Sequence, residues 1–461
     1  MPFIPHTEPQ VQDMLRRLDA DSIDDLFGEI PASLQRPAPP EIPAGLGEAG
    51  IGRIAKARAG RNHPLLCFAG GGAYEHHIPA AVWDIASRGE FYSNYTPYQA
   101  EAAQGSLQLT YEYQTMIAGL TGMDVANASL YDGATAFAEA CLMAVRCNKQ
   151  SGSRRIAVAR TVHPAWRAVA GTLLRGQGLE LVEIPLDARG KADFGPLGRD
   201  SGDGFAAIAV AAPNYLGGFP DVKAWRDRAD QEQALLVVGV NPVALGMLRP
   251  PGEWGADIVC GEGQPLGIPM SGGGPYLGLL ACKARYLRQM PGRVAGRTVD
   301  SAGHTAYALT LQAREQHIRR SRATSNICTN QGLMVTAATL HMALLGGEGL
   351  RRVAEACHAR TVELVDALTA IDGVRRAWDA PFFHEAALCL DRPVAPVLAA
   401  LADQRILGGI DISVEYPELG NALLVCATEM RTASEIQAYA SALSGIMRGH
   451  TVSSRQARHA A

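Results

Sequence analysis

Residues 255–275 read Gly-Ala-Asp-Ile-Val-Cys-Gly-Glu-Gly-Gln-Pro-Leu-Gly-Ile-Pro-Met-Ser-Gly-Gly-Gly-Pro, and a second apolar run, Tyr276 to Cys282, follows directly. The residues from Asp257 to Cys260 lie between glycines and predict a short buried strand. The glycine- and proline-rich loop behind them cannot form a helix. A strand that ends in such a loop brings polar groups to the carboxyl edge of a sheet, where open α/β folds bind ligands. Taken alone, the same pattern fits a tight connection between two core strands equally well.

The residues around this loop predict an α/β sheet. From about residue 60 to residue 345, strand-like and helix-like segments alternate, as is typical of such sheets. The predicted strands are residues 156–159, 179–184, 206–211, 235–238, 257–259 and 277–281. One predicted helix carries Leu109, Tyr113, Met116 and Leu120 on one face and ends at Gly122.

The two ends of the chain differ from this central region. Thr7-Glu8-Pro9-Gln10 is a capping box that predicts a helix through Leu18, and Ser22 is placed to cap a second short helix. A proline-rich stretch at 36–43 reads as an extended linker, so we expect the arm to wrap around a partner. We therefore expect four parts: an N-terminal helical arm with linker (1–60), a large α/β domain (61–345), a small C-terminal α+β domain (346–448) and a polar, disordered tail (449–461).

Length and composition bound the function. The 461 residues are 47% hydrophobic and 19% charged, with a formal net charge of −4, so the chain can bury a large core and has no basic footprint for nucleic acid. We expect no membrane span, because no apolar run approaches the length of a membrane helix. The nine cysteines form no Cys-x-x-Cys pair. The N-terminus resembles no signal or transit peptide. These features favour the cytoplasm and predict no metal site.

Two polar segments could carry chemistry. Residues 91–99 read Phe-Tyr-Ser-Asn-Tyr-Thr-Pro-Tyr-Gln, a loop rich in hydrogen-bond donors on rigid aromatic rings. In residues 316–331 three arginines lead into small hydroxyl and amide side chains, which together predict an anion site. From composition alone, the favoured interpretation of the first segment is a loop whose tyrosines cover a core edge. For the second segment, composition alone favours a solvated basic helix end.

Together, these motifs resemble one family, the P-protein (glycine decarboxylase) of the glycine cleavage system. The resemblance rests on Gly-Ala-Asp-Ile-Val-x-Gly-Glu-Gly-Gln, on Tyr-Thr-Pro-Tyr-Gln-x-Glu-x-x-Gln-Gly and on the 316–331 segment, and it covers nearly the whole chain. It implies the aminotransferase-like fold (fold type I) of enzymes that use pyridoxal phosphate (PLP). The family's catalytic half holds PLP as a Schiff base on a lysine of the 255–275 loop. Gln264 stands at that position, so the chain resembles the half without the lysine, found where the enzyme is split into two chains.

The resemblance also implies that the cofactor pocket of this chain has decayed. Asn241 stands where lysine-bearing relatives place the aspartate that pairs with the pyridinium nitrogen, and His163 stands where an imidazole stacks on the ring. Asp132 is placed to cap the helix whose N-terminus binds the PLP phosphate in those relatives, which makes plain capping the better interpretation. None of the five lysines (Lys56, Lys149, Lys191, Lys223 and Lys283) has a strand-to-loop setting that would desolvate its amine.

The function that the resemblance implies is shared between two chains. A partner, glycine decarboxylase subunit 2, would hold PLP and decarboxylate glycine, and the aminomethyl group would pass to the lipoyl group of H-protein. We expect an α₂β₂ assembly. Asn94, Tyr95 and Tyr98 would act on the partner's site in trans, and Thr324, Ser325, Asn326 and Thr329 would lie at its cofactor. The alternatives are a non-catalytic scaffold or regulator and, less consistent with Gln264 and Asn241, a free-standing PLP enzyme.

Overall fold

The computed structural model describes residues 5–35, 43, 45–92, 95–187, 189–195 and 204–449. The chain divides into two compact units, Met1–Pro64 and Leu65–Ala461. Most of the proline-rich linker and the tail expected from His450 onward lie outside the described residues.

The first unit is a helical arm. It contains α1 (Glu8–Arg17), the 3₁₀ helix η1 (Asp24–Phe27) and α2 (Glu48–Ala59). The predicted capping box is confirmed, since the Thr7 N–H donates to the Gln10 side chain at 2.7 Å. Ser22 does accept a hydrogen bond from the backbone N–H of Asp25, at 3.3 Å. The segment that it caps is a single 3₁₀ turn of four residues.

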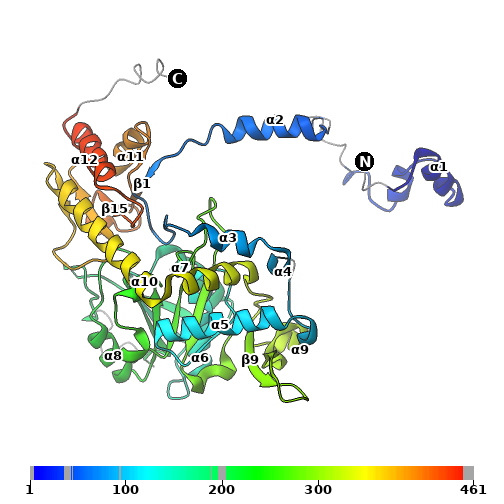
Figure 1. The fold of residues 1–461 in the computed structure, drawn as a ribbon, viewed down its shortest axis with the longest axis horizontal. Coiled ribbons are helices and arrows are strands. Elements are labelled where there is room, and N and C mark those ends of the chain that lie inside the picture. The colour runs from blue at the N-terminus through cyan, green and yellow to red at the C-terminus, as the bar shows by residue number, and fades with distance from the viewer. Residues whose placement is uncertain are drawn as a thin grey trace. The chain divides into compact units, whose positions relative to one another are not determined.

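The second unit is built on a seven-stranded sheet of mainly parallel strands (Figure 1). The spatial order is β2-β8-β7-β6-β5-β3-β4, and β3 to β7 run parallel while β8 runs antiparallel to its neighbours. The strands are β2 (Val125–Ala126), β3 (Arg155–Ala159), β4 (Glu180–Ile184), β5 (Ala207–Ala212), β6 (Leu235–Val240), β7 (Ile258–Glu262) and β8 (Gly278–Cys282). The six predicted strands are thus confirmed, with ends that differ by up to three residues.

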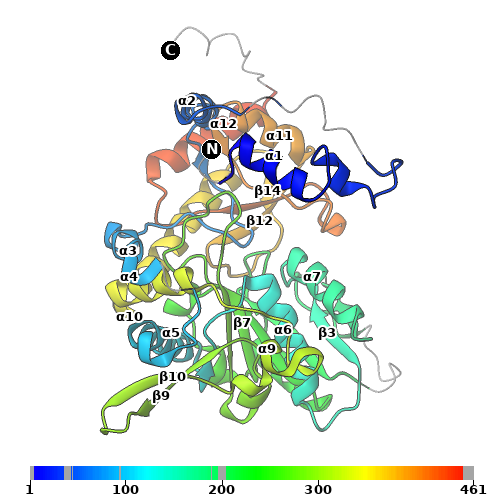
Figure 2. The same cartoon turned by 90° about the vertical axis from the view of Figure 1, so that its right-hand side faces the viewer.

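Helices cover both faces of this sheet. In Figure 2, α5 and α10 lie on one side of β7, and α6 and α7 lie on the other. The helices of this unit are α3 (Ala80–Ala86), α4 (Gly89–Tyr92), α5 (Gln104–Thr121), α6 (Gly133–Cys147), α7 (Pro164–Arg175), α8 (Val222–Gln231), α9 (Gln316–Arg319), α10 (Gly332–Thr369), α11 (Val394–Ala402) and α12 (Ala433–Met447). Burial on both faces explains why the central strands are continuous apolar runs instead of alternating ones.

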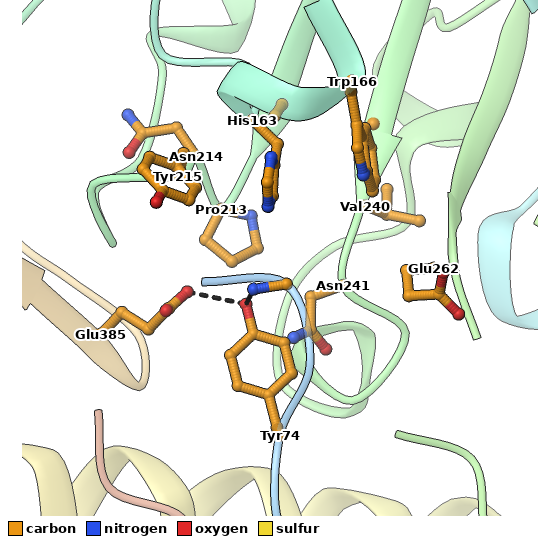
Figure 3. A pocket seen from close by; sticks show the side chains of 13 residues that line it. Tyr74, His163, Trp166, Pro213, Asn214, Tyr215, Val240, Asn241, Glu262 and Glu385 are labelled. Atoms are coloured by element: carbon orange, nitrogen blue, oxygen red, sulfur yellow. Dashed lines mark hydrogen bonds between the residues drawn. The ribbon is translucent and has the colours of Figure 1, made fainter. Parts of the chain in front are cut away.

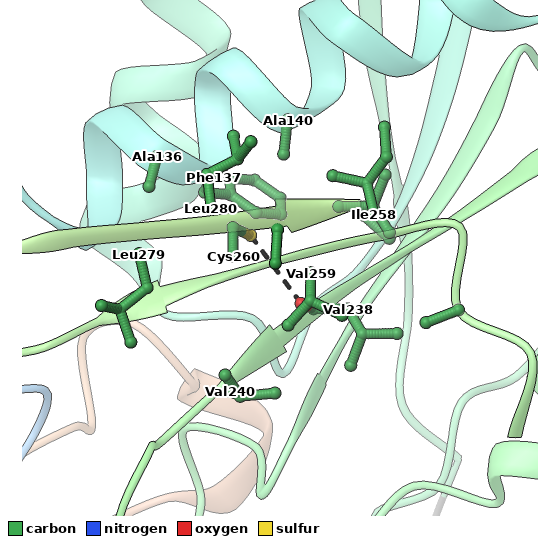
Figure 4. Packing of buried hydrophobic residues seen from close by; sticks show 14 of the residues in the cluster. Ala136, Phe137, Ala140, Val238, Val240, Ile258, Val259, Cys260, Leu279 and Leu280 are labelled. Carbon is green, nitrogen blue, oxygen red and sulfur yellow. Dashed lines mark hydrogen bonds between the residues drawn. The ribbon is translucent and has the colours of Figure 1, made fainter. Parts of the chain in front are cut away.

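The core lies between α6 and the sheet (Figure 4). Ala136, Phe137 and Ala140 of α6 point at Cys260 of β7 and at Leu280 of β8, and all five side chains are fully buried. Small residues on this helix let its backbone approach the sheet closely. Burying such a cluster is the main stabilising contribution to the unit.

Helix α5 confirms the predicted helix and its end but shifts its buried face. Gly122 ends the helix in the left-handed conformation, with a φ of 67°. The fully buried positions are Leu107, Tyr113 and Ile117, whereas Leu109 and Met116 are half-buried. Side chains of the β9–β10 hairpin (Val294–Val299 and Thr305–Thr310) pack against the helix from the side and shift the buried stripe.

Helix α10 joins the central sheet to a smaller one. It bends at Gly346, whose φ of 60° and ψ of −178° no side chain adopts easily. Although the sequence shows no unbroken apolar run of that length, the helix is long and apolar enough to cross a membrane by length and composition alone. It lies against α5 in the core, and 44% of its apolar window is buried, as in the core helix of a globular unit.

The smaller sheet has four antiparallel strands in the order β11-β12-β15-β14. They are β11 (Val374–Arg376), β12 (Glu385–Leu390), β14 (Ile410–Asp411) and β15 (Ala422–Cys426), while β1 (Leu66–Cys67) pairs with β13 (Ile406–Leu407). Leu388 of β12 pairs with Leu423 of β15, and a capping box of Thr432 and Glu435 begins α12. The domain boundary at residue 345 stays a prediction.

Candidate functional site

The carboxyl ends of four parallel strands meet at one pocket (Figure 3). His163 follows β3, Tyr215 follows β5, Asn241 follows β6, and Glu262 ends β7. Because parallel strands end at the same edge, polar residues that follow them in the sequence gather there. The strand-to-loop stretch at 255–275 therefore lies at the carboxyl edge of the sheet, where α/β folds bind ligands, and does more than connect two core strands.

Gln264 follows Glu262 by two residues and is 1% exposed. Its side-chain oxygen accepts the N–H of Tyr74 at 2.8 Å. Its amide nitrogen donates to the carbonyls of Tyr74, at 3.0 Å, and Ile268, at 2.7 Å. The amide oxygen and both amide hydrogens therefore bond to the backbone. The amide holds the loop together and presents no nucleophile.

Glu262 closes one side of the pocket. Its carboxylate accepts the N–H groups of Gly133, Gln264 and Leu277 at 2.8, 2.9 and 3.0 Å. Burial, with a smaller repulsion from Asp132, raises the pKa of Glu262 to about 7 in spite of these donors. Gly133 is required here, since a Cβ on it would come within 2.4 Å of the Trp166 ring.

Two aromatic residues project from α7 into the pocket. The rings of His163 and Trp166 are nearly parallel, with centroids 5.9 Å apart. Nε2 of His163 donates to the Gly71 carbonyl at 2.7 Å, and Nδ1 accepts the Ala165 N–H at 3.1 Å. These bonds need the neutral ring, and burial lowers the pKa of His163 accordingly. The imidazole is thus fixed at the position where the resemblance placed it.

Opposite these rings, Glu385 from β12 pairs with Tyr74. The Tyr74 hydroxyl donates to Glu385 at 2.7 Å, and the Gly71 N–H donates to the same carboxylate at 2.6 Å. Burial raises the pKa of Glu385 to about 7. Near them, the Asn241 side-chain oxygen accepts the Val243 N–H at 2.9 Å, so this residue organises the turn after β6.

The pocket does not fit PLP held in the way that lysine-bearing relatives hold it. The first N–H groups of α6, which would face a phosphate, already donate to the carboxylates of Glu262 and Asp132. The predicted Asp132 cap is confirmed, and its acceptor oxygen lies 2.8 Å from the Thr135 nitrogen. The cavity of about 50 Å³ holds a few waters, and none of the described lysines lines it. Lys283 instead lies 3.4 Å from Asp257.

The second polar region lies at a different, exposed part of the unit. Tyr95 is 78% exposed and Tyr98 is 50% exposed, while Asn94 lies outside the described residues. Tyr98 stacks at an angle on His317, with ring centroids 5.3 Å apart. Neither tyrosine covers the core, contrary to the alternative interpretation of this loop.

The predicted cofactor-binding residues lie next to this loop. Thr324, Ser325 and Thr329 line one small cavity, and Asn326 is exposed. The arginines expected to charge this site, Arg319, Arg320 and Arg322, are exposed and do not line it. Its lining guanidinium groups belong instead to Arg293 and Arg314.

Arg293 is the residue that sequence reasoning missed. It immediately precedes β9 and is 4% exposed. Its guanidinium donates to the Tyr98 hydroxyl at 3.2 Å and to Thr329 Oγ1 at 2.6 Å, so it connects both predicted segments. No local pattern predicts contacts across 195 residues. The only sequence signal is an arginine in an otherwise apolar approach to a strand.

Comparison with known proteins gives one consistent result. The sequence profile of the family described as Glycine cleavage system P-protein matches residues 1–443. The chain is 56% identical over 452 residues to the probable glycine dehydrogenase (decarboxylating) subunit 1 of Nitrosospira multiformis, covering 97% of this chain and 100% of that protein. The similarly named protein of Nitrosomonas europaea is 57% identical over 447 residues, covering 96% and 98%.

Solved structures agree with the sequences. A crystal structure of glycine decarboxylase (P-protein) of the glycine cleavage system, in inhibitor-bound form, superposes with a TM-score of 0.85 at 41% identity, covering 97% of this chain and 100% of that one. A sphingosine-1-phosphate lyase of Burkholderia pseudomallei shares only the fold, with a TM-score of 0.65 at 17% identity over 93% and 96% of the two chains. The expected PLP fold type I architecture is confirmed, and the chain belongs to the glycine cleavage system P-protein family.

Proposed function

We propose that this chain is the subunit of glycine decarboxylase that lacks the Schiff-base lysine, and that it acts only with a homologous subunit that holds PLP. The observation that carries the proposal is Gln264, a buried amide whose hydrogen bonds all go to the backbone. When bound by the partner, PLP supplies the electron sink for the charge that remains after glycine loses CO₂.

The exposed polar region is the part of this chain that we place at the partner's site. Tyr95 and Asn94 would hydrogen-bond the glycine carboxylate, and Tyr98 would narrow the space beside it. Tyr95 is 78% exposed, which suits a group that finds its acceptor on another chain. Thr324, Ser325, Asn326 and Thr329 would donate to the phosphate of the partner's cofactor.

Substrate selection in this arrangement depends on exclusion. Glycine has no side chain to recognise, and a site can reject a larger amino acid only by leaving it no room. Rigid aromatic rings lose little entropy on ordering and serve this purpose well. The lipoyl group of H-protein would then accept the aminomethyl group, and this chain would form part of the surface on which H-protein docks.

The arm supplies a reason for obligate assembly. Between residues 18 and 34, five apolar side chains are at least half exposed: Leu18, Ile23, Leu26, Phe27 and Leu34. Burying them against the partner would stabilise an α₂β₂ tetramer in the cytoplasm. Deletion of residues 1–40 should therefore weaken binding of the partner, measured by titration calorimetry, without changing the melting temperature of the second unit. Full affinity after deletion would argue against a wrapped arm.

Reconstitution tests the function directly. The chain should co-purify with the lysine-bearing subunit, and glycine–bicarbonate exchange should require both chains, PLP and lipoylated H-protein. The chain alone should show no exchange, and borohydride should trap no PLP on its lysines. Exchange by the partner alone at the full rate would reduce this chain to a scaffold or regulator. PLP trapped on this chain would contradict the division of roles.

A further inference from the structure

Arg293 makes an unusual set of contacts for a buried cation. Besides Tyr98 and Thr329, its guanidinium donates to the side-chain oxygen of Asn330 at 3.0 Å and to the carbonyl of Cys328 at 3.1 Å. All four acceptors are neutral. The paired carboxylate, Glu315, is 3.8 Å from Nε. The guanidinium also lies 5.4 Å from the centre of the Tyr98 ring.

This geometry has a cost that packing alone would not require. Burial of a charge is unfavourable unless polar groups surround it, and an apolar side chain would fill the same space at a lower cost in desolvation free energy. An arginine is useful here because its planar fork can bond several acceptors at fixed angles. The acceptors belong to two segments that are far apart in the sequence, at 98 and at 328–330.

The two segments are those that line the cavities on either side of Arg293. One cavity is lined by Tyr95, Pro97 and Asn330, and the other by Thr324, Ser325 and Thr329, with Arg293 in both. We infer that Arg293 is a positioning residue that fastens the Tyr95–Tyr98 loop to the 324–330 segment, so that the chain presents both to the partner's site as one rigid surface. The inference rests on the proposed function.

The expected effect on rate follows from geometry. A displacement of about 1 Å of a group that orients substrate costs on the order of 100-fold in rate. Lysine keeps the charge of arginine but lacks the planar fork whose two terminal nitrogens bond Tyr98 and Thr329 separately. Arg293→Lys therefore keeps the positive charge but removes the connection between the two segments.

The first measurement uses the chain by itself. Hydrogen–deuterium exchange should become at least about tenfold faster in both segments, 95–103 and 324–331, in Arg293→Lys. In Tyr98→Phe it should become faster in 95–103 alone, because only one of the two connections is removed. Arg249→Lys is the matched control, since Arg249 is exposed and pairs with Glu253 on the same turn. Unchanged exchange in Arg293→Lys would overturn the inference.

The second measurement uses the reconstituted enzyme. Arg293→Lys should lower kcat for glycine–bicarbonate exchange about 10- to 100-fold, with assembly intact, and Arg249→Lys should match wild type. If Arg293→Lys does not fold, Tyr98→Phe and Thr329→Val each remove one connection and should each lower kcat. A wild-type kcat in these variants would refute the inference while the proposed function stands. Failure of the wild-type chain to support exchange would refute the proposed function itself.

Discussion

The pocket at the carboxyl edge of the sheet and the exposed region around Tyr95 differ in where their polar side chains form hydrogen bonds. In the pocket, the carboxylates of Glu262 and Glu385 and the amide of Gln264 all bond to groups of the same chain. In the exposed region, Tyr95 projects into solvent from a scaffold that Arg293 holds in place. A polar pocket saturated by its own chain stabilises a fold, whereas unsaturated polar groups on a rigid support are available to another molecule.

The largest expected effect tests the structural side of this comparison. Gln264→Ala leaves three buried backbone groups unpaired, and each such group costs about 1–3 kcal/mol. We expect the free energy of unfolding in urea to fall by roughly 3–9 kcal/mol. Gln404→Ala, at an exposed helix end, is the control and should change it by less than about 0.5 kcal/mol. A small loss for Gln264→Ala would mean that the amide does not hold the loop.

The second effect is a pH dependence of stability. Glu385 has a folded-state pKa of about 7, above the value near 4.5 of an unfolded chain. The folded state therefore holds its proton while the unfolded state releases it, so stability falls as pH rises from about 4.5 to 7. The loss approaches about 3 kcal/mol for a shift of this size.

Glu385→Gln should remove this contribution because an amide does not titrate, and its oxygen can still accept the hydrogen bond of the Tyr74 hydroxyl. Unfolding free energies at pH 5 and pH 8 should differ less in the variant than in wild type. The remaining slope is expected to come from Glu262, whose pKa is raised in the same direction. Equal slopes for the variant and wild type would show that Glu385 ionises normally.

The third effect tests the exposed side. Loss of one hydrogen bond to a charged group costs about 1.5–3 kcal/mol, or one to two powers of ten in rate. Tyr95→Phe and Asn94→Ala should lower glycine–bicarbonate exchange by that factor in the reconstituted enzyme. Tyr92→Phe is the matched control, since Tyr92 is also exposed, at 63%. Wild-type rates for Tyr95→Phe, Asn94→Ala and Tyr98→Ala would leave the subunit as a scaffold.

The smallest effect sharpens the distinction between buried and exposed arginines. Arg322→Lys should change exchange less than about twofold, because this side chain is exposed and replacement by lysine keeps its charge. A loss comparable to that expected for Arg293→Lys would place Arg322 at the cofactor after all.

The sequence predicted what depends on neighbours along the chain. The strands β3 and β5 to β8 were predictable because each is mostly apolar, and the Asp132 and Thr432 caps because capping is local. The chemistry of Gln264 was predictable from its residue type. Its partner Tyr74, 190 residues away, was not, and the same holds for Arg293 and Tyr98. The prediction that the arginines at 319–322 charge the anion site was wrong, because composition cannot distinguish an exposed cation from one that lines a cavity.

The backbone hydrogen bonds of Gln264 also oppose a lysine at this position. A lysine at this position would restore an amine but would leave the Tyr74 N–H without its acceptor and would place a cation beside Glu262. The α6 N-terminus would still be occupied by carboxylates. Recovery of an independent catalyst would need several coordinated substitutions, each unfavourable by itself. A single substitution at Gln264 would therefore not create a lysine-type PLP site in this chain.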